Sequence, residues 1–120
     1  MILVDSSVWI DHIVSANPRL SSLLNDRLVL SHPFVLGELA CGSMKRRAEI
    51  LGHVGQLPEA PIAGHREVMA LVERQRLAGS GIGWVDAHLL ASAMLASALL
   101  WAADRPLDRV ARRLGISASQ

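Results

Sequence analysis

Cysteine, lysine, tyrosine and long apolar runs are scarce or absent in this 120-residue chain, and these scarcities exclude several classes of protein. Cys41 is the single cysteine, which excludes an internal disulfide and a cysteine-based zinc site. The longest apolar stretch, from Leu89 to Ala103, is too short to cross a bilayer. The first residues also lack the basic segment of a signal peptide. We therefore expect no membrane association and a place in the reducing cytoplasm.

Aromatic side chains are also few, at 3% of the chain, and they do not alternate with basic residues, so we expect no base-stacking surface. The formal net charge of +1 does not by itself demand a nucleic-acid partner. Basic residues nevertheless gather in two runs. Such runs are usually solvated faces, and contact with phosphates is the alternative. The runs are Lys45, Arg46 and Arg47, and Arg105, Arg109, Arg112 and Arg113.

Apolar residues are plentiful by contrast. The hydrophobic fraction is 51% and the charged fraction 19%, values typical of a compact folded protein rather than a disordered one. The length is close to the commonest size of one domain with one core. We therefore expect a single domain over residues 1–120.

The hydrophobic pattern alternates between short strands and helices. Such alternation favours right-handed crossovers, a mainly parallel sheet and helices on both of its faces. The sequence therefore predicts an α/β/α sandwich. The expected strands are 2–4, 28–30 and 98–103, with 57–63 as an edge strand or extended connection and a short last strand from residue 116; the expected helices are 6–14 capped by Ser6 or Ser7, 18–25, 33–41 opened by Ser31 and Pro33, 44–54, 67–78, a buried 84–97, and one from residue 106.

Two aspartates follow predicted strands. Asp5 comes after strand 2–4 and Asp104 after strand 98–103. Ligands of open parallel sheets bind beyond the carboxyl ends of the strands, so both carboxylates reach one edge if these strands are neighbours. Either aspartate alone would serve equally well as the N-cap of the next helix. The coincidence of two favours a functional site.

Glu38 and Asp86 lie on predicted helices that are otherwise rich in apolar residues. The neighbours of Glu38 at i−4, i−3 and i+3 are all apolar, which predicts that its carboxylate faces the interior and needs a cation or a donor there. The alternative is a narrow exposed strip of that helix. Asp86 lies in the first turn of helix 84–97, where the helix dipole favours an anion, so capping explains it as well as catalysis does.

Four carboxylates at one site repel one another, so such a site needs a divalent cation. Oxygen ligands favour Mg²⁺ or Mn²⁺ over zinc. An acidic metal cluster without an organic-cofactor motif is typical of phosphoryl transfer, in which the metal polarises the phosphate and lowers the pKa of a bound water. The acids therefore predict hydrolysis of a phosphodiester by in-line attack of a metal-activated water.

Other functional motifs are missing from the sequence. The glycine-rich segment 79–83 follows a helix rather than a strand, so it predicts a turn and not a dinucleotide site. The histidines show no pairing at i and i+4, which argues against a histidine-based metal site. A haloacid-dehalogenase-like phosphatase needs a second aspartate where Ser7 stands. A receiver-like signalling domain needs a lysine after a late strand, whereas Lys45 is the sole lysine.

Four segments of the chain resemble the PIN domains of VapC-type toxins. Each contains one of the four acids, and they occur in the family's order over nearly the whole length. The segments are Val4–Asp11, with a strand ending in Asp before Ser, Leu36–Gly42, Val85–Ala93 and Leu100–Asp108.

This resemblance implies a PIN-like α/β/α sandwich and Mg²⁺- or Mn²⁺-dependent endonucleolytic cleavage of RNA. It also implies a homodimer that is inhibited by a cognate VapB-type antitoxin in a hetero-oligomer. A PIN domain that only binds a partner remains the non-enzymatic alternative. The family's acidic quartet corresponds to Asp5, Glu38, Asp86 and Asp104.

Two further positions follow from the same resemblance. Ser7 corresponds to a hydroxyl that orients a carboxylate or a metal-bound water, and Asp108 to an additional acid found near the metal in some members. The Asp108 side chain is also predicted to form a surface ion pair with Arg112, four residues on. One departure is Ala102, because the family often has Thr or Ser two residues before the fourth acid.

Overall fold

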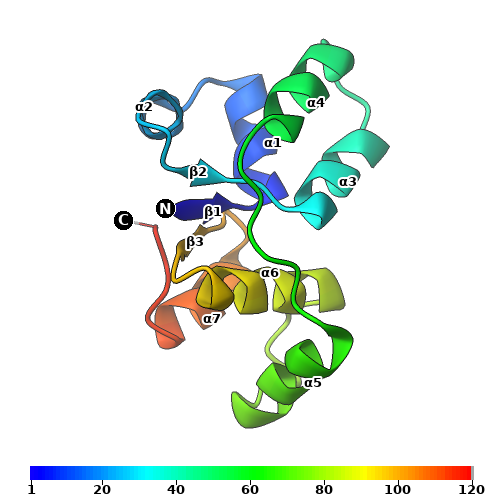
Figure 1. Ribbon diagram of the computed structural model, residues 1–120, viewed down its shortest axis with the longest axis vertical. Helices are drawn as coiled ribbons and strands as arrows, with labels where there is room; N and C mark the ends of the chain where they lie inside the picture. Colours follow the sequence, from blue (N-terminus) through cyan, green and yellow to red (C-terminus); the bar gives the residue numbers. More distant parts are fainter. Residues whose placement is uncertain (120) are drawn as a thin grey trace.

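The computed structural model describes residues 1–119, in which a small parallel sheet lies between two groups of helices. Figure 1 shows α1 to α4 on one side of the sheet and α5 to α7 on the other. This arrangement confirms the predicted α/β/α sandwich. The elements are β1 (Ile2–Val4), α1 (Ser6–Val14), α2 (Pro18–Asn25), β2 (Val29–Leu30), α3 (Pro33–Cys41), α4 (Arg47–Gly55), α5 (His65–Arg74), α6 (Trp84–Leu95), β3 (Leu99–Trp101) and α7 (Arg105–Arg113).

The sheet has the order β2-β1-β3, and all of its pairs are parallel. β1 is the central strand, with Leu3 opposite both Leu30 and Leu100. Isolated parallel bridges at Glu59 and Ser117 extend the two edges beyond β2 and β3. Because every pair is parallel, the carboxyl ends of the strands meet at one edge of the sheet, where Asp5 follows β1.

β1 is buried on both faces, since strands flank it and helices cover it. Ile2, Leu3 and Val4 are 9%, 0% and 0% exposed, respectively. A parallel strand buried on both faces is expected to be a continuous apolar run rather than an alternating one, and Ile-Leu-Val fits that rule. Because both faces of β1 are buried, its register in the sheet is fixed, and this register sets the position of Asp5.

A buried polar pair joins the two helical layers. His32 is fully buried and caps α3, where its Nδ1 accepts a hydrogen bond from the Phe34 amide at 3.0 Å. Nε2 therefore carries the ring proton and donates to the Ser92 hydroxyl of α6 at 3.0 Å. Burial, and secondly the neighbouring His88, lower the pKa of His32, so the ring is held neutral. This bond ties the helix carrying Glu38 to the helix carrying Asp86.

The apolar segment 84–103 is divided differently from the prediction. α6 ends at Leu95, and β3 is only Leu99–Trp101 rather than 98–103. Ser97 turns the chain between them with a φ of +51°. The centre of α6 is buried, but Met94 and Leu95 at its end are exposed, as is Leu99. A run of Ala and Leu contains no Gly or Pro to mark these boundaries, so its pattern could not locate them.

Other boundaries move by a few residues. The predicted helix 67–78 becomes α5, and the predicted helix 44–54 becomes α4, which begins later. The segments 57–63 and 116 onward form single bridges instead of strands, so of the predicted alternatives for 57–63 the extended connection is the better description. Within residues 1–119 no helix has both the length and the apolar character needed to cross a membrane.

Replacing the central core residue Leu3 tests the importance of β1. Leu3 is fully buried, so Leu3→Ala leaves a cavity and is expected to lower the free energy of unfolding by about 2–5 kcal/mol. Ile62→Ala is the matched control, because Ile62 is 57% exposed, and its effect is expected to stay within about 0.5 kcal/mol. Urea unfolding with unchanged m values measures both. Equal losses in the two variants would contradict this placement of the core.

Candidate active site

Three of the four predicted acids lie at helix N-termini beyond the carboxyl edge of the sheet. Asp5 directly follows β1 and caps α1, where it accepts a hydrogen bond from the Ser7 amide at 3.2 Å. Asp104 follows β3 by three residues and caps α7, accepting from the Leu107 amide at 3.2 Å. Asp86 lies in the first turn of α6 and accepts from the Gly83 amide at 3.1 Å. All three therefore have the capping role that the sequence offered as an alternative, and each acid meets the positive end of a helix.

The Ser7 hydroxyl joins the ends of β1 and β3. Its Oγ donates to Asp5 Oδ2 at 2.5 Å and accepts from the Ala103 amide at 3.0 Å. The Asp5 carboxylate is thereby fixed relative to the residue that precedes Asp104. Ala102 is buried and offers no hydroxyl, yet this link is made through the backbone of the next residue.

Asp5, rather than Ser6 or Ser7, is the N-cap of α1, which corrects the predicted cap. Ser6 instead donates its hydroxyl hydrogen bond to Glu38 Oε1 at 3.3 Å, a contact between α1 and α3. No local sequence pattern indicates this role, because a serine after a strand is the usual pattern of a helix cap. Similarly, His32 rather than Ser31 caps α3, since Ser31 is engaged in the bridge to Glu59.

The prediction that Glu38 faces the interior is wrong. Glu38 is exposed, whereas the buried face of α3 is formed by Val35 and Leu39. Its apolar neighbours misled the prediction, because Phe34 is only half-buried and Cys41 is exposed. Glu38 therefore borders the region in front of the sheet edge, and its carboxylate is accessible to a ligand from solvent.

The pKa shifts show that the four acids influence one another. Partial burial of the Glu38 carboxyl group is the main cause that raises its pKa. The charges of Asp5 and Asp86 raise this pKa further, whereas the hydrogen bond from Ser6 lowers it. Burial is also the main cause that raises the pKa of Asp86; the Gly83 hydrogen bond opposes it, and the charges of Asp5 and Asp104 add to it. Each acid thus acts electrostatically on at least one other. The structure brings all four predicted acids into one neighbourhood.

Within residues 1–119, no cationic side chain forms an ion pair with this acidic cluster. The ion pairs of these residues involve Glu49 and Asp108 and none of the four acids. No three acidic, histidine or cysteine side chains of the described residues are close enough together to form a complete ligand set. The donor set consists of carboxylate oxygens, so its chemistry fits Mg²⁺ or Mn²⁺.

Asp108 stands apart from this cluster. It forms the predicted ion pair with Arg112 at 2.8 Å and accepts the Ser117 hydroxyl at 2.6 Å. Burial alone would raise its pKa, but the hydrogen bonds from Ser117 and Arg112 outweigh this and lower the pKa. Both Asp108 oxygens are therefore occupied, one by Arg112 within α7 and the other by Ser117 of the C-terminal segment.

Much of the two basic runs serves structure. Arg46 pairs with Glu49, and Arg47 donates to the Ala40 carbonyl near the end of α3. Arg113 donates to the Gln75 carbonyl at the end of α5 at 2.7 Å. Among the described contacts, Arg105 and Arg109 have neither a hydrogen bond nor an ion pair. These two arginines remain available for an external anion.

The chain belongs to the PIN-domain family, whose model, described as PIN domain, matches residues 2–113. Two curated relatives, each named ribonuclease VapC32, come from two strains of Mycobacterium tuberculosis, CDC 1551 / Oshkosh and ATCC 25618 / H37Rv. Each is 44% identical over 121 residues, covering 100% of this chain and 98% of the relative.

A solved structure supports the fold. The crystal structure of PAE2754 from Pyrobaculum aerophilum matches with a TM-score of 0.62, covering 91% of this chain and 78% of that one. The sequence identity is 16%, so this likeness concerns the fold alone.

The Glu38→Gln variant tests whether the negative charge of Glu38 destabilises the folded protein. Its raised pKa means that ionisation costs more free energy in the folded than in the unfolded state, so stability falls as pH rises through that pKa. Glu38→Gln keeps the acceptor for Ser6 and removes the charge. In EDTA we expect the variant to be more stable than wild type at neutral pH, with the difference vanishing below the ordinary value of 4.5.

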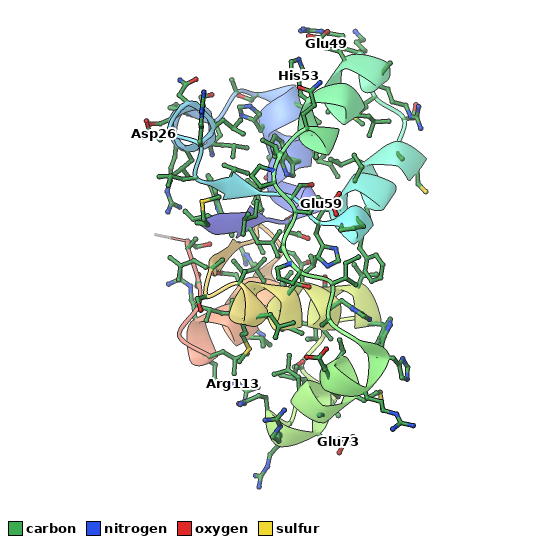
Figure 2. All side chains as sticks on the ribbon, viewed as in Figure 1. Asp26, Glu49, His53, Glu59, Glu73 and Arg113 are labelled. Carbon is green, nitrogen blue, oxygen red and sulfur yellow. The ribbon has the colours of Figure 1, made fainter. Side chains whose placement is uncertain are left out.

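Urea unfolding at the two pH values measures this effect. Glu73→Gln is the control, because Glu73 is an exposed carboxylate of α5 and lies far from the sheet edge in Figure 2. A Glu38→Gln protein no more stable than wild type at neutral pH would show that the cluster carries no electrostatic strain.

Proposed function

We propose that this protein is a Mg²⁺- or Mn²⁺-dependent endoribonuclease toxin of a VapBC-type toxin–antitoxin pair. The observation that carries the proposal is the gathering of Asp5, Glu38, Asp86 and Asp104 at one sheet edge without a cationic partner. The relatives named ribonuclease VapC32, at 44% identity over the full chain, supply the class of substrate.

The four acids would hold the metal through their carboxylate oxygens. A bound divalent cation would stabilise negative charge on the phosphate and make water a stronger acid. Asp5 is 5% exposed and already oriented by Ser7, so it is the most rigid of the four. Glu38 and Asp104 are exposed and can adjust, so we assign them the outer positions of the site.

The chain's own groups contribute charge and proton transfer. The N-termini of α1, α6 and α7 each meet one of the aspartates, and their dipoles favour anions such as a phosphate. Glu38 stands at the accessible rim, so a carboxylate oxygen that the metal leaves free could accept a proton from the attacking water. Neither task requires a histidine at the reacting atoms.

We assign the antitoxin to the apolar surface beside Glu38. Ile10 and Val14 of α1 are 52% and 84% exposed, and with Ile13 and Glu38 they border a hollow of about 180 Å³. An extended or helical antitoxin segment placed there would cover exposed apolar side chains and reach the acids. The exposed Met94 and Leu95 at the end of α6 and Leu99 at the start of β3 favour self-association as the homodimer. We place this reaction in the cytoplasm, where RNA is available.

Cleavage of RNA is the first test of the proposed function. The purified protein is expected to cleave total RNA with Mg²⁺ or Mn²⁺ and to be inactive in EDTA. Asp5→Asn removes a ligand charge at nearly constant shape and is expected to lower the rate by at least roughly 100-fold. Asp108→Asn is the control, because its partners are Arg112 and Ser117, and most activity should remain.

Two outcomes would contradict the proposal. Undiminished cleavage by Asp5→Asn, with contaminating nuclease excluded, would contradict the proposed metal site. A wild-type protein that binds no Mg²⁺ or Mn²⁺ in calorimetric titration and cleaves no RNA would indicate a PIN domain that only binds a partner.

Growth of the producing cell is the second test. Expression of the protein alone is expected to arrest growth, and co-expression of the small protein encoded beside it is expected to restore growth. Asp5→Asn should be harmless at the same protein level, because the arrest depends on cleavage. Growth unaffected by a soluble, metal-binding wild-type protein would contradict the toxin role.

A further inference from the structure

A basic hollow lies along α7, between this helix and the loop that connects α5 to α6. Its volume is about 310 Å³, and three arginines line it: Arg76 from the loop, and Arg109 and Arg113 from α7. The remaining lining residues are small or apolar, and none of the described residues that line it is acidic. The hollow therefore concentrates positive charge in a protein whose formal net charge is only +1.

These arginines differ in how they are held. Arg113 is fixed by its hydrogen bond to the Gln75 carbonyl, and Figure 2 labels it on the side of the sheet that carries α5. The side chains of Arg76 and Arg109 form no hydrogen bond or ion pair within residues 1–119. Three positive charges around one hollow repel one another, and an anion between them would relieve that repulsion. Guanidinium groups bind phosphate in a bidentate manner, which makes phosphate the best-fitting anion.

The hollow is connected to the acidic cluster by the first turn of α7. Arg105, Arg109 and Arg113 are spaced at i, i+4 and i+8, so they lie along one face of that helix. The row begins next to Asp104, and Arg109 lies about 7.5 Å farther along the helix axis. The loop between α5 and α6 packs closely on the first turn of α7. A Cβ atom added to Gly81 of this loop would lie only 3.3 Å from Pro106 Cβ. The same loop ends at Gly83, which bonds to Asp86.

We propose that the hollow formed by Arg76, Arg109 and Arg113 binds a backbone phosphate of the RNA strand whose scissile phosphate lies at the four acids. This inference rests on the proposed ribonuclease function. The hollow holds the backbone rather than a base, because its other lining residues offer no aromatic ring for stacking. It therefore supplies affinity and strand direction without selecting a sequence.

A double variant, Arg76→Asn with Arg109→Gln, tests the proposal without disturbing the fold. Arg76 has a φ of +53°, a conformation that Asn tolerates well, and Arg109 is an exposed helical residue for which Gln is a good helix former. Arg113 is left unchanged because it also binds the end of α5. The matched control is Arg27→Asn with Arg66→Gln. Arg27 has a φ of +57° and precedes β2, at the opposite end of the sheet from Asp5.

Binding of a single-stranded RNA is measured in EDTA over a series of salt concentrations. The loss of one phosphate contact lowers the slope of log K against log salt by about 0.7, so the double variant should lose about 0.7 and the control should match wild type. With Mg²⁺, the variant should show a raised KM and an unchanged kcat at saturating RNA. Inorganic phosphate should compete weakly and equally in wild type and control.

The possible failures are distinguishable. If wild type cleaves no RNA with any metal, the proposed function fails, whereas the binding result still reports on the hollow. If wild type cleaves RNA but the double variant keeps the slope and KM of the control, the hollow is not an RNA subsite. Loss of antitoxin binding with unchanged RNA binding would make it a protein-docking surface and overturn the proposal. Failure of wild type to bind RNA in EDTA would overturn it too.

Discussion

The mutual repulsion of four carboxylates at one sheet edge is the constraint around which this fold is arranged. Three features offset it. The aspartates cap helices, so each is near the positive end of a helix dipole; Ser7 and Ser6 donate to Asp5 and Glu38; and two of the acids remain exposed to water. The pKa values of Glu38 and Asp86 stay raised, mainly through burial and in part through the neighbouring acids. Under the proposed function, a divalent cation bound there would relieve this repulsion and would thereby also stabilise the fold.

Holding the acids together also requires that the two helical layers keep a fixed relation. The central strand β1 provides this through parallel pairing with β2 and β3. Ser7 then ties the end of β1 to the chain after β3, and His32 ties α3 to α6 through Ser92. Each of these two links is a hydrogen bond between residues far apart in sequence, and each joins segments of the chain that contain the four acids. Rigidity is thus concentrated at Asp5, while Glu38 and Asp104 at the rim keep the freedom to close on a ligand.

The sequence was sufficient for the architecture and for the four acids, and insufficient for their environments. Strand ends followed by Asp5 and Asp104 were predictable because parallel strands place their carboxyl ends together. The exposure of Glu38 was not predictable, because a helix such as α3 with apolar residues on several sides does not reveal which side packs. The ends of α6 and β3 were lost in an Ala- and Leu-rich run without turn residues. Ser6 could not be recognised from a local pattern, because its hydrogen bond is made to Glu38 of α3. The same holds for Arg76, which lines a hollow together with residues of α7 that are distant in sequence.

Asp104 and Asp108 show how position assigns different roles to the same side chain. They lie four residues apart, one before α7 and one within it. Asp104 precedes the helix, so its backbone is extended and its carboxylate borders the sheet edge, where its charge acts on Asp86. Asp108 lies one turn later, where Arg112 and Ser117 occupy both of its oxygens and lower its pKa. A carboxylate that already has two strong donors has little to gain from a metal, whereas one crowded by other acids gains much. The same helix presents Arg105, Arg109 and Arg113 on one face, so α7 and its N-cap combine an acidic beginning with a basic side. Under the proposed function an RNA strand would use both: its scissile phosphate would meet the acids through a cation, and another phosphate would meet the arginines directly.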